Sequence, residues 1–339
     1  MDKILKNVLL FLFFVFIISI PTITYAYAFE KVFYLSGGKS GIESLKNNAD
    51  KIDILAPQSY SISAKLLPSG SVSAEIKNFA SKNHIKVMPL IVNAGFSQSV
   101  IHNLLTSTTA QDNIIQYMIK EAASNNYVGW QLDLEHIYFR DKDLYSNFVE
   151  KTASAFREKN LILSIAAVAR KSDYEDSDFY MNWSGAFDYK RLAESLDFIS
   201  IMTYDDPNSK SSPATIPFVE EILAYLIDKI PPQKLSLGIP LYYWGWSMEP
   251  FKRVRTGGTY ERIKFIKTTY PIWWQGFDNT KGVPWLFYVD SGKRYIIWFE
   301  NEKSFTNRIE IIKNDQLRGF SAWVLGMEDP KIWNVLDNN

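Results

Sequence analysis

The sequence of 339 residues predicts an α/β fold, a closed (β/α)8 barrel of the TIM type with a small α+β insertion. Short apolar runs typical of buried strands alternate with stretches of helical periodicity, and eight such units can be counted. No Gly-rich dinucleotide-binding fingerprint follows the first apolar run. Eight alternating units in a chain of this length favour a closed barrel over an open doubly wound sheet.

The first half of the chain contains four of the expected strands. Apolar runs mark them, and turn residues such as Gly37 and Gly38 separate strands from the helical patterns that follow. In order, we expect a strand at 32–35, a helix at 42–51, a strand at 52–56, a polar excursion up to residue 70, a helix at 74–83, a strand at 86–92, a helical region at 98–125 divided near 106–109, and a strand at 128–135.

The second half repeats this alternation, interrupted once. We expect a helix at 142–159, a strand at 161–168, a polar loop to residue 185, a helix at 189–196, a strand at 198–204, a helix at 217–230 stopped by Pro231 and Pro232, and a strand at 235–242. After the interruption, a helix at 300–314, a strand at 320–325 and a short helix at 330–336 complete the pattern.

The interruption lies at about 246–299, between the seventh strand and its helix. Short aromatic-rich runs at 283–289 and 295–299 read as strands, and a helical piece is expected at 260–267. This composition predicts a small α+β lobe inserted into the barrel.

The N-terminus has the layout of a secretory signal peptide. Lys3 and Lys6 precede an apolar run at 8–20, which is followed by Pro21 and by a small-residue site that ends at Ala28. The run is shorter than the roughly 20 residues that a membrane span needs, although an uncleaved anchor is an alternative. We therefore expect residues 1–28 to be removed and residues 29–339 to form a barrel that is secreted, extracellular or periplasmic within the cell envelope, without stable membrane insertion.

Composition excludes several classes of function. The 37 basic and 37 acidic side chains balance, which argues against a nucleic-acid partner. The absence of cysteine excludes disulfides, thiolate metal sites and a cysteine nucleophile, and no other metal-ligand spacing is present, so we expect no metal and no cofactor. The 10 Trp, 19 Tyr and 22 Phe suit sugar binding, where flat rings meet the apolar faces of sugars. A monomer is expected.

Two acids stand out in the fourth expected strand. Side chains alternate along a strand, so Gln131, Asp133 and Glu135 share one face while the other face is apolar. Burying a carboxylate without partners is costly, so such acids are paired, shifted in pKa, or catalytic. A structural salt-bridge network at the mouth of the sheet and a catalytic pair both fit this pattern.

Four segments, at corresponding barrel positions and in the same order, resemble glycoside hydrolase family 18, which includes chitinases and wall-associated N-acetylglucosaminidases. They are Gln131-Leu-Asp133-Leu-Glu135 on strand four, Met202-Thr203-Tyr204-Asp205 on strand six, Leu237-Gly238-Ile239-Pro240-Leu241-Tyr242 on strand seven, and Trp323 on strand eight. The resemblance runs from about residue 32 to the end of the chain.

The resemblance implies roles for these residues. Glu135 would be the general acid, Asp133 would steady the acetamido N–H of the sugar, and Tyr204 would donate to the acetamido oxygen. Trp323 would form the floor of the sugar site. The other expected sugar-binding residues are Met202, Asp205, Gln131, Tyr242 and Tyr60.

The implied function is that of a secreted retaining glycosidase. It would hydrolyse β-1,4-linked N-acetylglucosamine glycans, chitin-like or derived from peptidoglycan, by substrate-assisted catalysis through the 2-acetamido group. The alternative is a lectin-like barrel that binds such glycans without cleaving them.

Two departures from the family pattern bear on this choice. Val128 and Gln131 stand where the family has acids, so we expect activity with an altered pH profile. Tyr243 and Trp244 stand where Gly and a basic residue are common, which should reshape the glycan groove.

Overall fold

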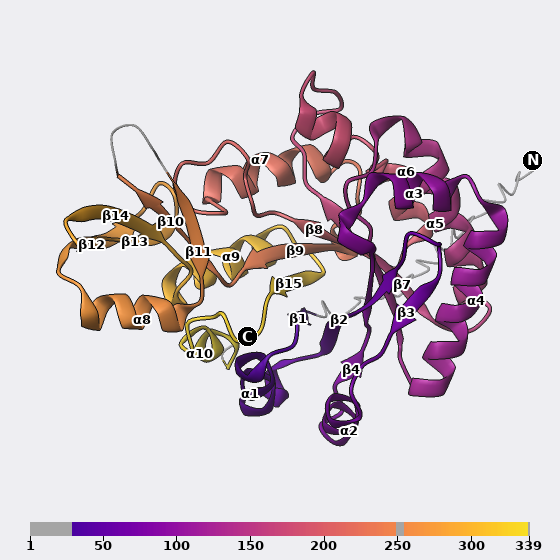
Figure 1. Cartoon of the computed structure of the whole chain (residues 1–339), viewed down its shortest axis with the longest axis horizontal. Helices are drawn as coiled ribbons and strands as arrows, with labels where there is room; N and C mark the ends of the chain where they lie inside the picture. Colours follow the sequence, from indigo (N-terminus) through magenta and orange to yellow (C-terminus); the bar gives the residue numbers. More distant parts are fainter. Residues whose placement is uncertain (1–28, 249–253, 338–339) are drawn as a thin grey trace, which may run out of the picture.

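The computed structural model describes residues 29–248 and 254–337 and shows the expected closed barrel (Figure 1). Eight parallel strands form its wall, and the ring closes because the first strand pairs with both the second and the last. In barrel order the strands are β1 (Glu30–Leu35), β2 (Ile54–Ile62), β5 (Leu90–Asn93), β6 (Gly129–Asp133), β7 (Ile162–Val168), β8 (Phe198–Met202), β9 (Leu235–Pro240) and β15 (Gly319–Trp323).

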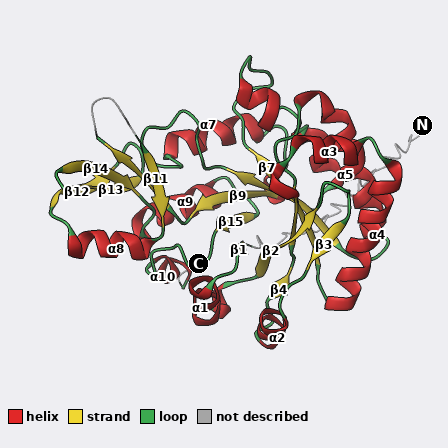
Figure 2. Ribbon diagram, in the orientation of Figure 1, coloured by secondary structure: helices red, strands yellow, loops and turns green. Residues whose placement is uncertain are grey.

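Helices surround this wall (Figure 2), and the expected helices are present with ends shifted by a few residues. They are α1 (Lys39–Asn47), α2 (Ala74–Lys82), α3 (Gln98–Leu105), α4 (Thr108–Asn125), α5 (Lys142–Arg157), α6 (Tyr189–Ser195), α7 (Ile216–Leu226), α9 (Glu302–Asn314) and α10 (Ile332–Leu336). Short 3-10 turns lie at Ala49–Lys51, Ala94–Phe96, Phe139–Asp141 and Pro232–Lys234, and a π-helical turn at Tyr180–Ser184 interrupts the expected polar loop.

Two early strands differ from expectation. The second continues to Ile62 and folds back antiparallel onto β3 (Pro68–Gly70), so the polar excursion is a hairpin. Gly70 permits this close pairing, since a Cβ there would lie 2.1 Å from the carbonyl oxygen of Ser59. The third is split into β4 (Lys86–Val87) and β5, because Pro89 between them has no N–H to donate to the sheet.

The main core lies between the barrel wall and the helices. The alternation of β6 sends Trp130 and Leu132 into this layer, where the Trp130 indole N–H donates to the carbonyl of Met118 in α4 at 2.9 Å. The intervening residues Gln131 and Asp133 therefore point into the barrel.

Among the described residues, no helix is long and apolar enough to cross a membrane. The expected signal peptide lies outside the described residues.

The insertion is a second sheet of five antiparallel strands with one helix, at the left in Figure 1. Its first strand begins at Tyr243, three residues before the expected start of the lobe. In sheet order the strands are β11 (Arg255–Gly258), β10 (Tyr243–Ser247), β14 (Lys293–Trp298), β13 (Val283–Asp290) and β12 (Ile272–Asp278). Helix α8 (Tyr260–Thr269) packs Ile263 and Ile266 on one face of this sheet.

Candidate active site

The two acids of the fourth strand lie at the carboxyl end of the barrel. Asp133 is the last residue of β6 and is 4% exposed, whereas Glu135, two residues later, is half-buried. The amide of Gln58 on β2 donates to Asp133 at 3.5 Å. The middle of β2 and the end of β6 therefore meet at one buried carboxylate.

Burial and mutual repulsion set the protonation of this pair. Burial raises the pKa of Glu135, and the negative charge of Asp133 raises it further. Burial also raises the pKa of Asp133, but hydrogen bonds from Gln58 and Glu135 oppose that rise. Since the opposing hydrogen bonds act on Asp133 and the repulsion acts on Glu135, the proton shared by the pair resides on Glu135.

Asn93, at the end of β5, holds the main chain of Glu135 from both sides. Its side-chain oxygen accepts from the Glu135 N–H at 3.1 Å, and its amide donates to the Glu135 carbonyl at 3.0 Å. Asn93 is fully buried. The sequence analysis missed this residue, because its link to a segment 42 positions away depends on the closure of the sheet.

Gln131 belongs to a layer of polar side chains inside the barrel. Its amide donates to the hydroxyls of Ser164 and Ser200, each at 2.9 Å, and Ser321 bridges Ser200 to Ser236 at 2.7 Å each. Gln131 is fully buried and does not line the cavity described below. It contributes to the support beneath Asp133 rather than to a surface that a glycan could reach.

Strand β8 and the segment after it bring Met202, Tyr204 and Asp205 to the same end of the barrel. The ring of Tyr204 lies edge-on to Tyr242, with centroids 6.4 Å apart, and the Tyr242 hydroxyl donates to Asp205. Burial is the largest cause that raises the pKa of Tyr204 well above its usual range, so Tyr204 keeps its phenolic proton and can act as a donor.

Gly238 on β9 makes room for this tyrosine. A Cβ at position 238 would lie 2.9 Å from Cε1 of Tyr204 and 2.4 Å from the carbonyl oxygen of Ile201. The glycine in the strand-seven segment is therefore required by the close approach of β8.

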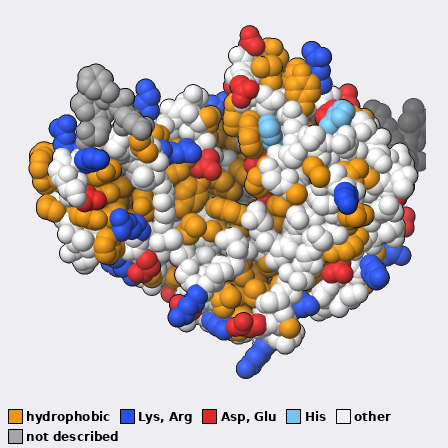
Figure 3. Space-filling model, viewed as in Figure 1, with side chains coloured by type: hydrophobic (Ala, Val, Ile, Leu, Met, Phe, Trp, Pro, Cys, Tyr) orange, Lys and Arg blue, Asp and Glu red, His pale blue; other side chains and the backbone are white. Residues whose placement is uncertain are grey.

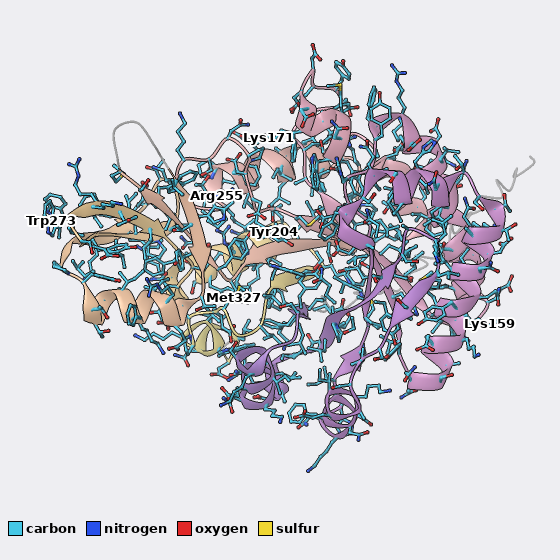
Figure 4. All side chains as sticks on the ribbon, in the orientation of Figure 1. Lys159, Lys171, Tyr204, Arg255, Trp273 and Met327 are labelled. Carbon is cyan, nitrogen blue, oxygen red and sulfur yellow. The ribbon has the colours of Figure 1, made fainter. Side chains whose placement is uncertain are left out.

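A cavity of about 570 Å³ opens beside these residues. Glu135, Met202, Tyr204 and Asp205 line it, together with Arg255 from β11 of the lobe. Figure 3 shows the hollow between the barrel and the lobe, and in Figure 4 Arg255 and Lys171 both lie above Tyr204. The other walls come largely from the loop after β7 and from Phe218 and Ile222 of α7. The cavity thus joins an acid, a phenol and apolar walls.

Neither Trp323 nor Tyr60 is among the residues that line this cavity. Trp323, at the end of β15, is partly exposed and packs against Tyr34, with ring centroids 5.3 Å apart. Tyr60 lies on the helix side of the wall, where its hydroxyl bonds Tyr127 at 2.9 Å. The register of β2 shifts between Gln58 and Tyr60, so Gln58, and not Tyr60, reaches the acids.

The described residues contain no group of three or more His, Cys, Asp or Glu side chains placed to hold a metal ion.

The model of the family described as glycosyl hydrolases family 18 matches residues 19–328. A glycosylase of Bacillus subtilis, YvbX, described as uncharacterized, is 23% identical over 312 residues, covering 89% of this chain and 89% of that protein. A cortical fragment-lytic enzyme of Bacillus cereus is 28% identical over 283 residues, covering 79% of this chain and 63% of that protein.

Solved structures show the same fold. The spore cortex-lytic enzyme SleL of Bacillus cereus superposes with a TM-score of 0.82 at 24% identity, covering 92% of this chain and 74% of that chain. A chitinase of Chromobacterium violaceum superposes with a TM-score of 0.81 at 22% identity, covering 91% of this chain and 98% of that chain.

Proposed function

This chain belongs to glycosyl hydrolases family 18 and is a glycoside hydrolase, and we propose that it is a secreted, retaining enzyme that cleaves β-1,4-linked N-acetylglucosamine glycans. The observation that carries the proposal is the acid pair, in which Glu135 lines a cavity and holds its proton because its own burial, and then the charge of Asp133, raise its pKa. A protonated carboxyl at neutral pH is what a glycosidic leaving group needs.

The first step uses the substrate's own acetamido group. Glu135 gives its proton to the glycosidic oxygen as the bond to the anomeric carbon breaks, and the acetamido carbonyl oxygen bonds to that carbon from the opposite face. The product is an oxazolinium ion, whose positive charge the Asp133 carboxylate stabilises through the acetamido N–H. Tyr204 donates to the acetamido oxygen and so orients it for attack.

The second step restores the enzyme. Glu135, now a carboxylate, takes a proton from a water molecule, whose oxygen attacks the anomeric carbon and opens the oxazoline ring. Two inversions at one carbon give retention of configuration. One carboxyl therefore serves as acid and then as base, and no protein nucleophile is required.

The names of the relatives support two classes of glycan as the proposed substrate. The cortical fragment-lytic enzymes and the chitinase structures are named for spore cortex and chitin respectively. A soluble peptidoglycan fragment or a chitin-like oligosaccharide is therefore the proposed substrate. Secretion is proposed from the basic start and apolar run of residues 1–28, and protein recovered outside the cytoplasm should begin at Phe29.

The direct test compares two glutamates that line the same cavity. Glu135→Gln should lower hydrolysis of chitooligosaccharides or peptidoglycan fragments by about 10² to 10⁴-fold, the usual effect of losing a general acid. Glu175→Gln, which changes another lining carboxyl that accepts from Ser172, should leave the rate unchanged. Equal loss in both variants would refute the assignment of Glu135.

A second measurement tests the mechanism. Glycans in which a hydroxyl replaces the 2-acetamido group should resist cleavage, and their hydrolysis would refute participation of the acetamido group. Binding of the acetylated glycans without release of products would instead support a lectin-like barrel. Gln131, which stands where the family has an acid, is the reason for testing this alternative.

A further inference from the structure

One row of side chains crosses all five strands of the lobe sheet. The residues that pair across neighbouring strands in this row are Trp274 on β12, Phe287 on β13, Ile296 on β14, Trp246 on β10 and Arg255 on β11. Paired residues in antiparallel strands point to the same face, so these five side chains form a line, here called the lobe row. With neighbouring strands about 4.8 Å apart, the row spans roughly 19 Å.

The face that carries the lobe row is the one that α8 does not cover. The alternate residues Leu286, Tyr288 and Ile297 pack on Ile263 and Ile266 of α8, which forms the small core of the lobe. The residues of the row remain accessible: Trp274 is 62% exposed, Phe287, Ile296 and Trp246 are partly exposed, and Arg255 is exposed. Large exposed aromatic surface of this kind marks a binding surface.

A β-bulge enlarges the aromatic end of the row. The register of β12 against β13 shifts between Ile272 and Trp274, so Trp273 is an extra residue in the strand. Both indoles consequently contact the same ring, with centroids 5.8 Å from Trp273 to Phe287 and 5.6 Å from Trp274 to Phe287. Without the bulge, two successive tryptophans would point to opposite faces.

The other end of the row opens into the proposed active site. Arg255 lines the cavity that contains Glu135, and its guanidinium lies 4.1 Å from the ring centroid of Trp244. The indole N–H of Trp246 donates to the carbonyl of Ser211, in the loop that also carries Asp205. Figure 4 places Trp273 at the outer end of the lobe and Arg255 beside Tyr204.

We propose that the lobe row binds the distal part of the polymeric glycan whose cleaved bond lies at Glu135. The inference rests on the proposed function, and it adds a second contact region outside the cavity. Indole and phenyl rings suit the apolar faces of pyranose rings. Because the row runs without interruption from Trp274 to Arg255 at the cavity, it favours a glycan that is long enough to contact the row and enter the cavity. Short substrates would not reach Trp274.

The experiment measures binding and turnover separately in the full chain. Binding to insoluble peptidoglycan and to chitin is measured by sedimentation in a Glu135→Gln background, so that no substrate is consumed. Trp274→Ala should weaken binding to one of these polymers by about 3- to 10-fold, the effect of one aromatic contact. Phe265→Ala, which removes a 45% exposed ring on α8, is the matched control and should leave binding unchanged.

Turnover of a disaccharide glycoside is measured with Glu135 intact. Trp274→Ala should cleave it at the same rate as the parent protein, since the row acts on the distal part of a long chain. Equal polymer binding by Trp274→Ala and Phe265→Ala would overturn the proposal, as would a loss on the disaccharide equal to that on the polymer. Trp274-dependent binding to phosphatidylglycerol vesicles with unaltered glycan binding would also overturn it, in favour of a lipid surface.

Failure of the proposed function gives a different result. If Glu135→Gln still hydrolyses glycans, the catalytic assignment falls, but sedimentation at low temperature and short times still compares Trp274→Ala with Phe265→Ala. If the lobe row has no role, Glu135 should still be essential for hydrolysis, and Trp274→Ala and Phe265→Ala should bind the polymers equally.

Discussion

Side chains alternate along the strands of both the barrel and the lobe, but the two sheets differ in how many of their faces are covered. In the barrel both faces of β6 are covered, with Trp130 and Leu132 against helices and Gln131 and Asp133 inside. In the lobe only one face is covered, by α8, and the other presents Trp274 and neighbouring rings to solvent. Full burial shifts the protonation of acids, whereas an uncovered face offers area for contact. We therefore propose that catalysis belongs to the barrel sheet and glycan contact to the lobe sheet.

Arg308 on α9 lies where the chain returns from the lobe to the barrel, and its loss should have the largest effect. Its guanidinium pairs with Glu300 at 2.6 Å, both side chains are 2% exposed or less, and it donates to the carbonyl of Ala214 at 2.7 Å. Arg308→Met leaves Glu300 buried without its partner, so the free energy of unfolding should fall by about 3–5 kcal/mol. Urea denaturation followed by circular dichroism measures this loss.

The exposed pair of Arg191 with Glu150 provides the control, because its side chains are 31% and 39% exposed. Arg191→Met should cost no more than about 1 kcal/mol. Similar losses for both variants would show that the buried Arg308–Glu300 pair stabilises the fold no more than an exposed pair does.

Asp133→Asn should lower kcat about 10²- to 10³-fold, since it removes the charge that stabilises the oxazolinium ion. It should also move the pH profile. The charge of Asp133 raises the pKa of Glu135, so its removal lowers that pKa, and Glu135 loses its proton at lower pH. The alkaline limb of residual activity should shift to lower pH. A shift to higher pH would contradict the assignment of the proton to Glu135.

Tyr204→Phe should lower kcat/KM by up to about 10-fold, because it removes the hydrogen bond that would orient the acetamido oxygen, and a neutral hydrogen bond contributes about 0.5–1.5 kcal/mol. The loss should appear mainly in kcat. Tyr174→Phe, at a side chain that is 63% exposed, should leave both constants unchanged. An equal effect of the two substitutions would remove Tyr204 from the mechanism.

Trp274→Ala should have the smallest effect on the fold. Its indole is 62% exposed, so the free energy of unfolding should change by no more than about 0.5 kcal/mol. Trp130→Ala, at a fully buried indole, should cost about 3–5 kcal/mol. Thermal melts of the two variants measure this contrast, and a large loss for Trp274→Ala would mean that the row supports the lobe itself.

Periodicity was sufficient to predict the barrel, because alternation of strands and helices is a local property of the chain. The order of strands, the inward face of β6 and the place of the insertion follow from it. The segments around Glu135 and Tyr204 were likewise recognisable as motifs and converge at one end of the barrel, where Glu135 and Tyr204 line one cavity.

Contacts that depend on register or closure were not predictable. Tyr60 was expected to bind the sugar, but it lies within β2, where a register shift between Gln58 and Tyr60 turns it toward Tyr127 and leaves Gln58 beside Asp133. Arg255 was overlooked because nothing in its local sequence indicates that β11 ends at the cavity. A one-residue irregularity changes which face a side chain occupies, and periodicity alone does not locate it.

The two hydrogen bonds of Asn93 limit how far the Glu135 carboxyl, the proposed general acid, can move. Asn93 holds the peptide groups on both sides of the Glu135 Cα, at 3.1 Å and 3.0 Å, and leaves the side-chain torsions unconstrained by these bonds. The reach of the acid is therefore set by the number of its methylene groups. Glu135→Asp would keep the functional group yet fall short of the glycosidic oxygen, because the main chain cannot advance to compensate. The proposed position of the scissile bond therefore depends on the length of the Glu135 side chain.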